Sequence, residues 1–250
     1  MHPLRIEEAG LNAWPAAQHL LYDGWVLRFS HGYTKRANSV NILTPGELDL
    51  LEKIARCEAE YTRRDLPSIF RITSFNPPPE LDTTLAQRAY TQVSPTLVLG
   101  LELAQRRTPH LPTGSLHSEA LDPWLAIFCD LRGAALDQHQ MHRAILHAIP
   151  GQTQFAVLRD ESGAVVGCGI AVVDGAYMGL FDLIVDPAQR NQGYGAALVA
   201  HLLDWAATMG ARYAYLQVEE ANAPARRVYE AKLGYKMVYW YWYRVRNGLK

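Results

Sequence analysis

Hydrophobic residues in the second half of the chain follow two periods, and each period predicts one kind of element. Apolar runs separated by short polar turns predict antiparallel strands, at residues 154–158, 165–173 and 177–185. After the last run the apolar spacing becomes three and four residues, as an amphipathic helix requires, at Leu198, Leu202, Trp205 and Met209. The remaining predicted elements are helices at 122–131, 137–149 and 224–233 and strands at 212–219 and 236–246. Hairpins mixed with helix crossovers indicate an α/β fold with a mixed sheet.

The first half of the chain has the same order of elements. Its predicted strands are 25–30, 39–43, 68–74 and 92–103, and its predicted helices are 47–63 and 80–90. In the first of these helices the predicted apolar stripe consists of Leu48, Leu51, Ile54 and Ala55. Because the order of elements recurs, we predict that the chain contains a degenerate duplication.

A polar segment with three helix-breaking residues joins the two halves. It covers residues 105–118 and contains Pro109, Pro112 and Gly114. We therefore predict an N-terminal domain at 1–108, a linker at 109–118 and a second domain at 119–250.

Composition and charge are those of an ordinary globular protein, with 49% hydrophobic and 20% charged residues. A formal net charge of -1 argues against a broad nucleic-acid or membrane surface. No signal peptide or membrane-spanning run is expected. The three widely spaced cysteines Cys57, Cys129 and Cys168 are typical of buried thiols in a reducing cytosol. We expect a cytoplasmic protein with no metal, no nucleic-acid partner and no membrane partner.

The loop Arg190-Asn191-Gln192-Gly193-Tyr194-Gly195 lies between a predicted strand and a predicted helix. A helix N-terminus has unpaired N–H groups and a partial positive charge, so it suits a phosphate. Gly193 and Gly195 would let the backbone approach that phosphate closely. The loop predicts a cofactor that contains a pyrophosphate. The first half has Leu43-Thr44-Pro45-Gly46 at the matching place, so we expect no comparable phosphate site there.

Two motifs together resemble the GNAT superfamily of acyl-CoA-dependent N-acyltransferases. They are Arg190-x-x-Gly193-x-Gly195 and Asn222-x-x-Ala225-x-x-x-Tyr229, which is followed by Gly234-Tyr235. This resemblance covers roughly the second half. The first half is similar, more loosely, to the degenerate N-terminal GNAT-like domain of two-domain bacterial members, through Asp23-Gly24-Trp25 and Arg36-Ala37-Asn38-Ser39. The resemblance implies tandem GNAT domains, with acetyl-CoA as the cosubstrate.

The resemblance also implies which residues bind acetyl-CoA. Backbone groups of a strand that splays from its neighbour would hold the pantetheine arm, at Leu183, Ile184 and Val185. Backbone N–H groups of the loop would hold the pyrophosphate, at Arg190, Asn191, Gln192, Gly193, Tyr194, Gly195 and Ala196. Asn222 would bond the pantetheine or order the loop, and Tyr229 would lie near the thioester sulfur.

Acyl transfer to an amine needs an acid for the leaving thiolate and a base for the attacking ammonium. Tyr229 is the predicted acid. Its alternative role is to pack a helix against the sheet, because Tyr90 has the matching place in the first half. Some GNAT relatives have a glutamate where this chain has Gln217. Asp182 is the first predicted base, because a carboxylate in an apolar strand should have a partner or a function, and Glu219 is the second.

Two other groups of residues are less diagnostic. His139, His142 and His147 form no recognisable metal set, so a solvated or substrate-facing helix is expected. The final strand alternates tyrosine and tryptophan from Tyr239 to Tyr243, which predicts core on one face and an interface or pocket wall on the other. The same strand makes a homodimer one option.

The sequence therefore predicts an N-acetyltransferase that moves an acetyl group from acetyl-CoA to a primary amine. Direct attack in a ternary complex is expected, because neither motif contains a cysteine nucleophile. The acceptor, a small molecule or a protein amine, is not specified by these residues. The alternatives are a non-catalytic acyl-CoA-binding sensor and a protein-interaction scaffold.

Overall fold

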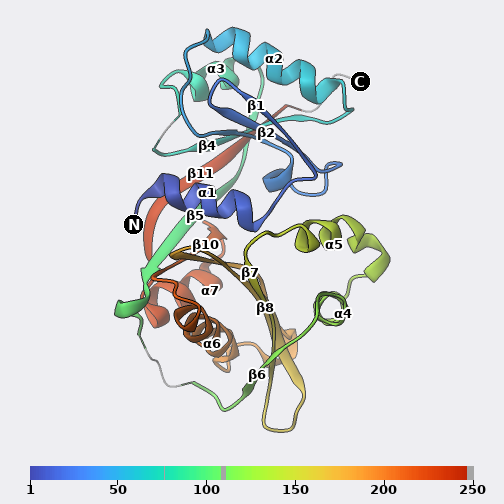
Figure 1. Cartoon of the computed structure of the whole chain (residues 1–250), viewed down its shortest axis with the longest axis vertical. Helices are drawn as coiled ribbons and strands as arrows, with labels where there is room; N and C mark the ends of the chain where they lie inside the picture. The colour runs from blue at the N-terminus through green and yellow to red at the C-terminus, as the bar shows by residue number, and fades with distance from the viewer. Residues whose placement is uncertain (76, 108–110, 247–250) are drawn as a thin grey trace. The chain divides into compact units, whose positions relative to one another are not determined.

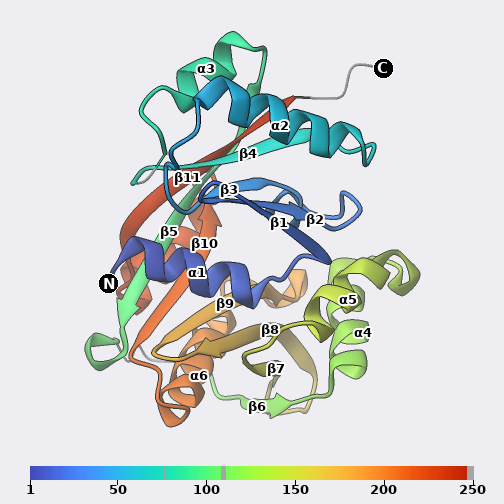
Figure 2. The same cartoon turned by 45° about the horizontal axis from the view of Figure 1, so that its top comes forward.

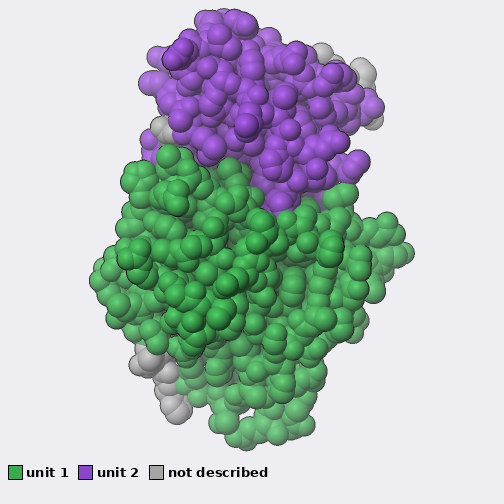
Figure 3. Space-filling view, in the orientation of Figure 1, with its two compact units in different colours: residues 1–13, 98–218, 222–238 green, residues 14–97, 219–221, 239–250 purple. Residues whose placement is uncertain are grey.

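The fold is described from a computed structural model, over residues 1–75, 77–107 and 111–246. The chain divides into two compact units, which are coloured separately in Figure 3. Unit 1 comprises residues 1–13, 98–218 and 222–238. Unit 2 comprises the described residues of 14–97, 219–221 and 239–250. Within the described ranges, no helix has both the length and the apolar character that crossing a bilayer would need.

The units are not divided at the predicted boundaries of 108 and 119. Helix α1 (Pro3–Ala13) belongs to unit 1, and the strands β5 (Thr91–Glu102) and β11 (Lys236–Arg246) each contribute to both units. Residues 109 and 110 of the predicted linker lie outside the described residues. Residues 115–118 of that linker form a strand, β6 (Ser115–Ser118), which pairs with β7 (Gln152–Arg159). A short polar edge strand has the composition of a linker, which explains the difference.

Unit 1 is a mixed sheet with the strand order β5-β10-β9-β8-β7-β6. The strands from β6 to β9 pair in antiparallel fashion, and β10 joins β9 in parallel. Its remaining strands are β8 (Val165–Asp174), β9 (Tyr177–Val185) and β10 (Tyr213–Glu219). Its remaining helices are α4 (Leu121–Arg132), α5 (Gln140–His147), α6 (Tyr194–Thr208) and α7 (Ala223–Arg226). Short helical turns complete it, at η2 (Leu103–Gln105), η3 (Leu136–His139), η4 (Pro187–Gln189) and η5 (Arg227–Leu233), the last of which is π-helical.

Helices cover both faces of the β7–β9 meander in unit 1 (Figures 1 and 2). A Cβ built on Gly169 of β8 would lie 3.5 Å from Cδ2 of Leu198, so this position faces α6. The neighbouring Cys168 points to the opposite face, because side chains alternate along a strand, and its thiol interacts with Cys129 of α4. The buried indole of Trp124 holds α4 in place by donating to the Ala156 carbonyl of β7 at 3.1 Å.

Helix α1 is an element that the sequence analysis did not predict. Its buried residues recur at helical spacing, at Ile6, Ala9, Gly10 and Ala13, and Pro3 stands at its first position. The helix packs against β8 and β9. At its C-terminal end the Asn12 amide donates to Oδ2 of Asp174 at 2.8 Å, which ties α1 to the end of β8.

Unit 2 repeats the order of elements with the strand order β1-β2-β3-β4-β11. Its strands are β1 (Gln18–Tyr22), β2 (Trp25–Phe29), β3 (Val40–Ile42) and β4 (Ser68–Thr73), and its helices are η1 (Lys35–Ala37), α2 (Leu50–Thr62) and α3 (Leu81–Gln87). Strand β11 pairs with β4 in antiparallel fashion, from Tyr241 opposite Thr73 to Arg246 opposite Ser68. Three strands, a helix, a strand, a helix and a strand thus occur twice, as β1 to β5 and as β7 to β11. This recurrence agrees with the predicted duplication.

The predicted apolar stripe of α2 is wrong at three of its four positions. Leu48 and Leu51 are 45% and 54% exposed and Ala55 is exposed as well, and the buried apolar residues of the helix are Ile54, Cys57 and Tyr61. The helix begins at Leu50, three residues later than predicted, because the carboxylate of Asp49 caps it. Leu48 therefore lies before the helix, and Leu51 and Ala55 lie on its exposed side.

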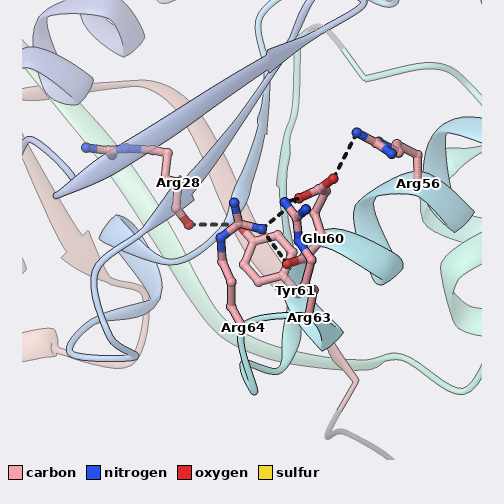
Figure 4. Close-up of polar contacts among 6 residues, drawn as sticks. All are labelled: Arg28, Arg56, Glu60, Tyr61, Arg63 and Arg64. Carbon is pink, nitrogen blue, oxygen red and sulfur yellow. Dashed lines mark hydrogen bonds and ion pairs between the residues drawn. The ribbon is translucent and has the colours of Figure 1, made fainter.

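The C-terminal half of α2 is held by a carboxylate among arginines (Figure 4). The buried Glu60 forms ion pairs of 2.9 Å with Arg56, 2.5 Å with Arg63 and 2.7 Å with Arg64. Hydrogen bonding from Arg64 is the main cause that keeps the pKa of Glu60 below its ordinary value. The hydroxyl of the neighbouring Tyr61 donates to the Arg28 carbonyl of β2 at 3.0 Å, so the helix is fixed to the sheet of unit 2.

Candidate active site

The strands β9 and β10 pair over only part of their length. Their parallel ladder runs from Tyr177 opposite Tyr213 to Leu180 opposite Leu216, whereas β9 continues to Val185. On its other edge β9 stays paired with β8 as far as Val185. The predicted splay is therefore present. Residues 181–185 of β9 continue past the last residue pair with β10, so their backbone edge on that side is not part of the β9–β10 ladder. Backbone groups on such an edge can pair with an extended ligand.

A bulge in β9 lies within this splayed segment. The register of β8 and β9 shifts between Cys168 and Ile170, and Asp182 has a φ of +48°. A non-glycine residue rarely adopts that conformation. Bulges redirect side chains, and they are over-represented beside active sites. The positive φ of Asp182 is a strained backbone conformation, and such a conformation persists only where the surrounding structure holds the residue in place.

The glycine loop forms the N-terminus of α6. Gly193 is the N-cap residue, with a φ of +94°, and it offers no side chain to cap the helix. Its carbonyl accepts hydrogen bonds from the N–H groups of Ala196 at 3.0 Å and Ala197 at 3.1 Å. The earlier N–H groups of the helix are thus left uncapped by a side chain, as an anion site at a helix N-terminus requires.

The corresponding helix start in unit 2 carries carboxylates of its own. Oδ1 of Asp49 accepts from the N–H groups of Leu51 at 2.9 Å and Glu52 at 3.1 Å. The carboxylate of Asp23 accepts from the N–H groups just before the helix, those of residues 47 and 48. An external phosphate would have to displace these carboxylates, so the two helix starts differ in what they can bind.

A cavity of about 740 Å³ in unit 1 brings the predicted acetyl-CoA residues together. The predicted residues that line it are Leu183, Ile184, Val185, Arg190, Asn191, Gly193, Tyr194, Gly195, Ala196, Asn222 and Tyr229. Gln192 is the predicted cofactor-binding residue that does not line it, and its side-chain amide donates to Gln189 at 2.9 Å. The splayed strand, the start of α6 and the α7–η5 segment therefore share one cavity.

The lining of this cavity is basic. It includes Arg190, Arg227 and Lys232, and the described residues that line it include no carboxylate. A concave surface with one sign of charge attracts a polyanion. The sequence analysis missed Arg227 and Lys232. Their signal was available, because both lie within the helical segment that follows Asn222.

The α7–η5 segment is fixed at both ends. Oδ1 of Asn222 accepts from the N–H of Ala225 at 3.3 Å and so caps α7. The π-helical turn ends at Gly234, where φ is +87°, and Arg107 donates to the Ala231 carbonyl at 2.7 Å. π-helical turns are frequent at functional sites, and this one carries Tyr229.

Tyr229 and Tyr90 occupy matching places in the two sequence repeats, but their surroundings differ. Tyr229 is half-buried and lines the cavity, and desolvation raises its pKa to about 12. Tyr90 is buried in unit 2, where its hydroxyl donates to Oε1 of Glu58 at 3.1 Å. Burial is the main cause that raises the pKa of Tyr90 as well. The phenol of Tyr229 keeps its proton at physiological pH and faces a ligand-sized space.

The two predicted bases have different settings. Oδ2 of Asp182 lies 2.8 Å from Nε2 of His142, so this strand carboxylate does have a partner. The solvated helix predicted for the histidines is wrong at His142, which is 1% exposed, although His147 is exposed. Glu219 is exposed at the end of β10. Among the residues that the structure covers, no three metal-ligating side chains gather as an ion site.

A mixed sheet with two splayed parallel strands beside a glycine-capped helix defines the GNAT class of N-acetyltransferases. Residues 4–244 match the family described as "Probable histone acetyltransferase Rv0428c C-terminal", and the chain belongs to that family. It is 28% identical over 249 residues to the uncharacterized N-acetyltransferase YobR of Bacillus subtilis, which covers 97% of this chain and 98% of that protein. The protein is thus an acyltransferase of the GNAT type.

Other similarities support the same fold. A mycothiol acetyltransferase of Clavibacter michiganensis subsp. michiganensis is 30% identical over 133 residues, 51% of this chain and 44% of that protein. The solved structure of a GCN5-related N-acetyltransferase from Kribbella flavida matches with a TM-score of 0.75 and 18% identity, over 98% of this chain and 96% of that one. A tandem GNAT protein from the clavulanic acid biosynthesis pathway matches with a TM-score of 0.67 and 13% identity, over 99% and 89%.

Proposed function

We propose that this protein transfers an acetyl group from acetyl-CoA to a primary amine, by direct attack in a ternary complex in unit 1. The observation that carries the proposal is that one basic cavity joins the splayed edge of β9, the uncapped start of α6 and Tyr229. Acetyl-CoA would supply an activated thioester to this cavity. Its diphosphate suits the helix N-terminus, and its extended pantetheine arm suits an open strand edge.

The assigned binding roles follow the lining of the cavity. Backbone N–H groups from Gly193 to Gly195, which precede the first N–H bonded within α6, hold the diphosphate, and residues 183–185 pair with the pantetheine arm. Arg190, Arg227 and Lys232 add positive charge for the phosphates, and Pro112 covers the loop at Gly193. Asn222 acts here by capping α7, which keeps the segment that carries Tyr229 in position.

The assigned acid–base roles follow protonation states. Asp182 accepts a proton from the acceptor ammonium, because only the neutral amine is a nucleophile. Tyr229 donates a hydrogen bond to the thiolate as it leaves. With a pKa of about 12, its phenol is a weaker acid than an ordinary thiol of pKa about 8.5. Complete transfer of the phenol proton to the thiolate would therefore be uphill in free energy, whereas donating a hydrogen bond to the thiolate is not. Glu219 remains the second candidate for the base.

The direct test is coenzyme A release, measured as free thiol, from acetyl-CoA with a panel of amines. The panel should include polyamines, amino acids, aminoglycosides and peptides with a free N-terminus. Wild type should release coenzyme A with at least one amine, and Asp182→Asn should slow that release while its affinity for acetyl-CoA by calorimetry stays the same. His147→Ala, on the exposed side of α5, is the matched control. Binding without release on any amine would favour the sensor, and absence of binding would contradict both functions.

A further inference from the structure

Asp182 is the first member of a chain of three side chains that leads away from the splayed strand. Oδ2 of Asp182 lies 2.8 Å from Nε2 of His142, and Nδ1 of His142 lies 3.2 Å from Nδ1 of His139. These residues come from β9, α5 and η3, which all belong to unit 1. Both ring nitrogens of His142 therefore have a partner: Nε2 contacts Asp182 on the splayed strand, and Nδ1 contacts His139.

The middle of this chain is shielded from water. His142 is 1% exposed, and the rings of Phe128 and Trp124 pack edge-on against it, with centroids at 5.3 and 6.4 Å. A buried ring between two polar groups is a costly arrangement unless both of its nitrogens are paired. Ionisable groups near these three residues include the thiol of Cys168 beside Asp182, the thiol of Cys129 beside Cys168, and the guanidinium of Arg132 near His139.

The far end of the chain reaches the protein surface. His139 is half-buried and lines a second cavity of about 530 Å³. The rim of this cavity includes exposed residues, at Asp122, Leu136, Asp137, Gln140 and Arg143. Asp122 and Arg143 pair with each other at 2.6 Å, so that neither charge is directed at His139 alone. His139 can thus exchange a proton with water.

Acetyl transfer to an ammonium releases one proton for each turnover. The reactants are an ammonium and a thioester, and the products are an amide, a thiol and one proton. We propose that Asp182, His142 and His139 form a relay that carries this proton from the acceptor to the second cavity. The inference rests on the proposed function. Asp182 contacts the acceptor, whereas His142 and His139 are positioning and relay residues that act through it.

Each transfer along the relay breaks one bond to hydrogen and forms another. Asp182 takes a proton from the ammonium and passes it to Nε2 of His142, so that an N–H bond of the amine and then an O–H bond of the acid are broken. His142 releases the proton on its Nδ1 to Nδ1 of His139. His139 releases the proton on its Nε2 to water. The rings regain their first tautomers after the products leave. Nε2 of His139 then takes a proton from water, the proton on Nδ1 of His139 returns to Nδ1 of His142, and the proton on Nε2 of His142 passes through Asp182 to water in the vacated acceptor site. No oxidant, reductant or further reactant is needed.

The surroundings of His139 suit the last transfer. Partial burial and the neighbouring His142 lower the pKa of His139 from its ordinary value of 6.5. The imidazolium that forms in transit is therefore disfavoured and loses its proton to water readily. A histidine with a raised pKa would hold the proton and slow the cycle.

The test is the rate of coenzyme A release by full-length wild type, His139→Ala and His139→Gln, with free imidazole added at constant ionic strength. The acceptor is the most active amine of the panel, or water where none is active, because hydrolysis also releases one proton. His139→Ala should lower kcat about tenfold, leave KM for acetyl-CoA unchanged, and regain activity as imidazole enters the second cavity. His147→Ala, at the far end of the adjoining helix α5, should match wild type and show no response to imidazole.

The possible results separate the relay from the proposed function. A His139→Ala variant with wild-type kcat, or one whose loss imidazole does not restore, overturns the relay and leaves the acetyltransferase intact. Wild type that releases no coenzyme A overturns both. A second readout that does not depend on turnover is NMR titration of the histidine ring nitrogens in wild type. Asp182→Asn should shift the signals of both His142 and His139, and a shift of His142 alone would also overturn the relay.

Discussion

A Cβ built on Gly193 would lie 3.1 Å from Cδ of Pro112. Gly193 thus meets two demands at once, because its φ of +94° also lies in the region that side chains rarely adopt. Pro112 covers the loop at the point where the backbone turns into α6. The contact explains why this position of the predicted phosphate loop has to be glycine, beyond the close approach of a phosphate.

The first prediction concerns Gly193→Ala. The strained φ costs about 1–2 kcal/mol, and the methyl group must also push Pro112 away from the loop. We expect acetyl-CoA affinity, measured by calorimetry, to fall about tenfold or more. Gly210→Ala is the matched control: it stands at the other end of α6 with a φ of +85°, and its Cβ would meet no atom within 4 Å. The control should lose similar stability and keep its affinity. Equal affinity losses in the two variants would contradict the account.

Tyr229→Phe should lower kcat about a hundredfold and leave acetyl-CoA affinity nearly unchanged. Because desolvation raises the pKa of Tyr229 to about 12, its phenol stays protonated until the pH approaches that value. The ratio of wild-type to variant kcat should therefore be constant from about pH 6 to about pH 9. A ratio that collapses within this range would mean that the phenol titrates there and that its role is different.

Asn222→Ala removes the side-chain cap of α7, which is typically worth about 1 kcal/mol. We expect acetyl-CoA to bind a few-fold more weakly, because the segment that carries Tyr229 becomes less ordered. Asn222→Ser keeps a capping oxygen and should bind as wild type does. If the serine variant is as weak as the alanine variant, Asn222 contacts the ligand itself and the capping explanation is incorrect.

Asp23 in unit 2 predicts a pH-dependent stability. Its hydrogen bond from Lys53, with further bonds from the N–H groups of Leu48 and Glu47, lowers its pKa from 3.8 to about 2. A lowered pKa stabilises the fold above the unfolded value and loses that effect as the pH falls through the folded value. Asp23→Asn should lower the urea midpoint at neutral pH, and the difference from wild type should shrink below about pH 4. A difference that is independent of pH would exclude this carboxylate as the cause.

The elements of the second half could be predicted because the spacing of apolar residues there agrees with the positions of the turn residues that bound each segment. The predicted strand at 177–185 matches β9. The apolar spacing after Gly193 matches α6 as far as Trp205, whereas Met209 lies just beyond the helix and is 42% exposed. The cavity lining also follows the two motifs closely, since local backbone shape decides it. In β5, by contrast, Ser94 has a positive φ, which the apolar pattern of the predicted strand at 92–103 does not indicate.

What the sequence could not show depends on contacts between distant segments. Asp182 and His142 are 40 residues apart, and nothing local to either one indicates their pairing. The pairing of β11 with β4 is likewise invisible in the composition, because an alternating pattern does not specify which strand edge it joins. Helix α1 was missed for a different reason: its stripe of small residues is weakly hydrophobic and resembles a surface segment.

The central claim is that the diphosphate of coenzyme A binds at the start of α6. A crystal structure of the protein with acetyl-CoA tests it most directly. The account predicts diphosphate oxygens within hydrogen-bonding distance of the backbone N–H groups of Gly193 to Gly195, with the thioester beside Tyr229. A diphosphate bound elsewhere, at the start of α2 for example, would contradict it.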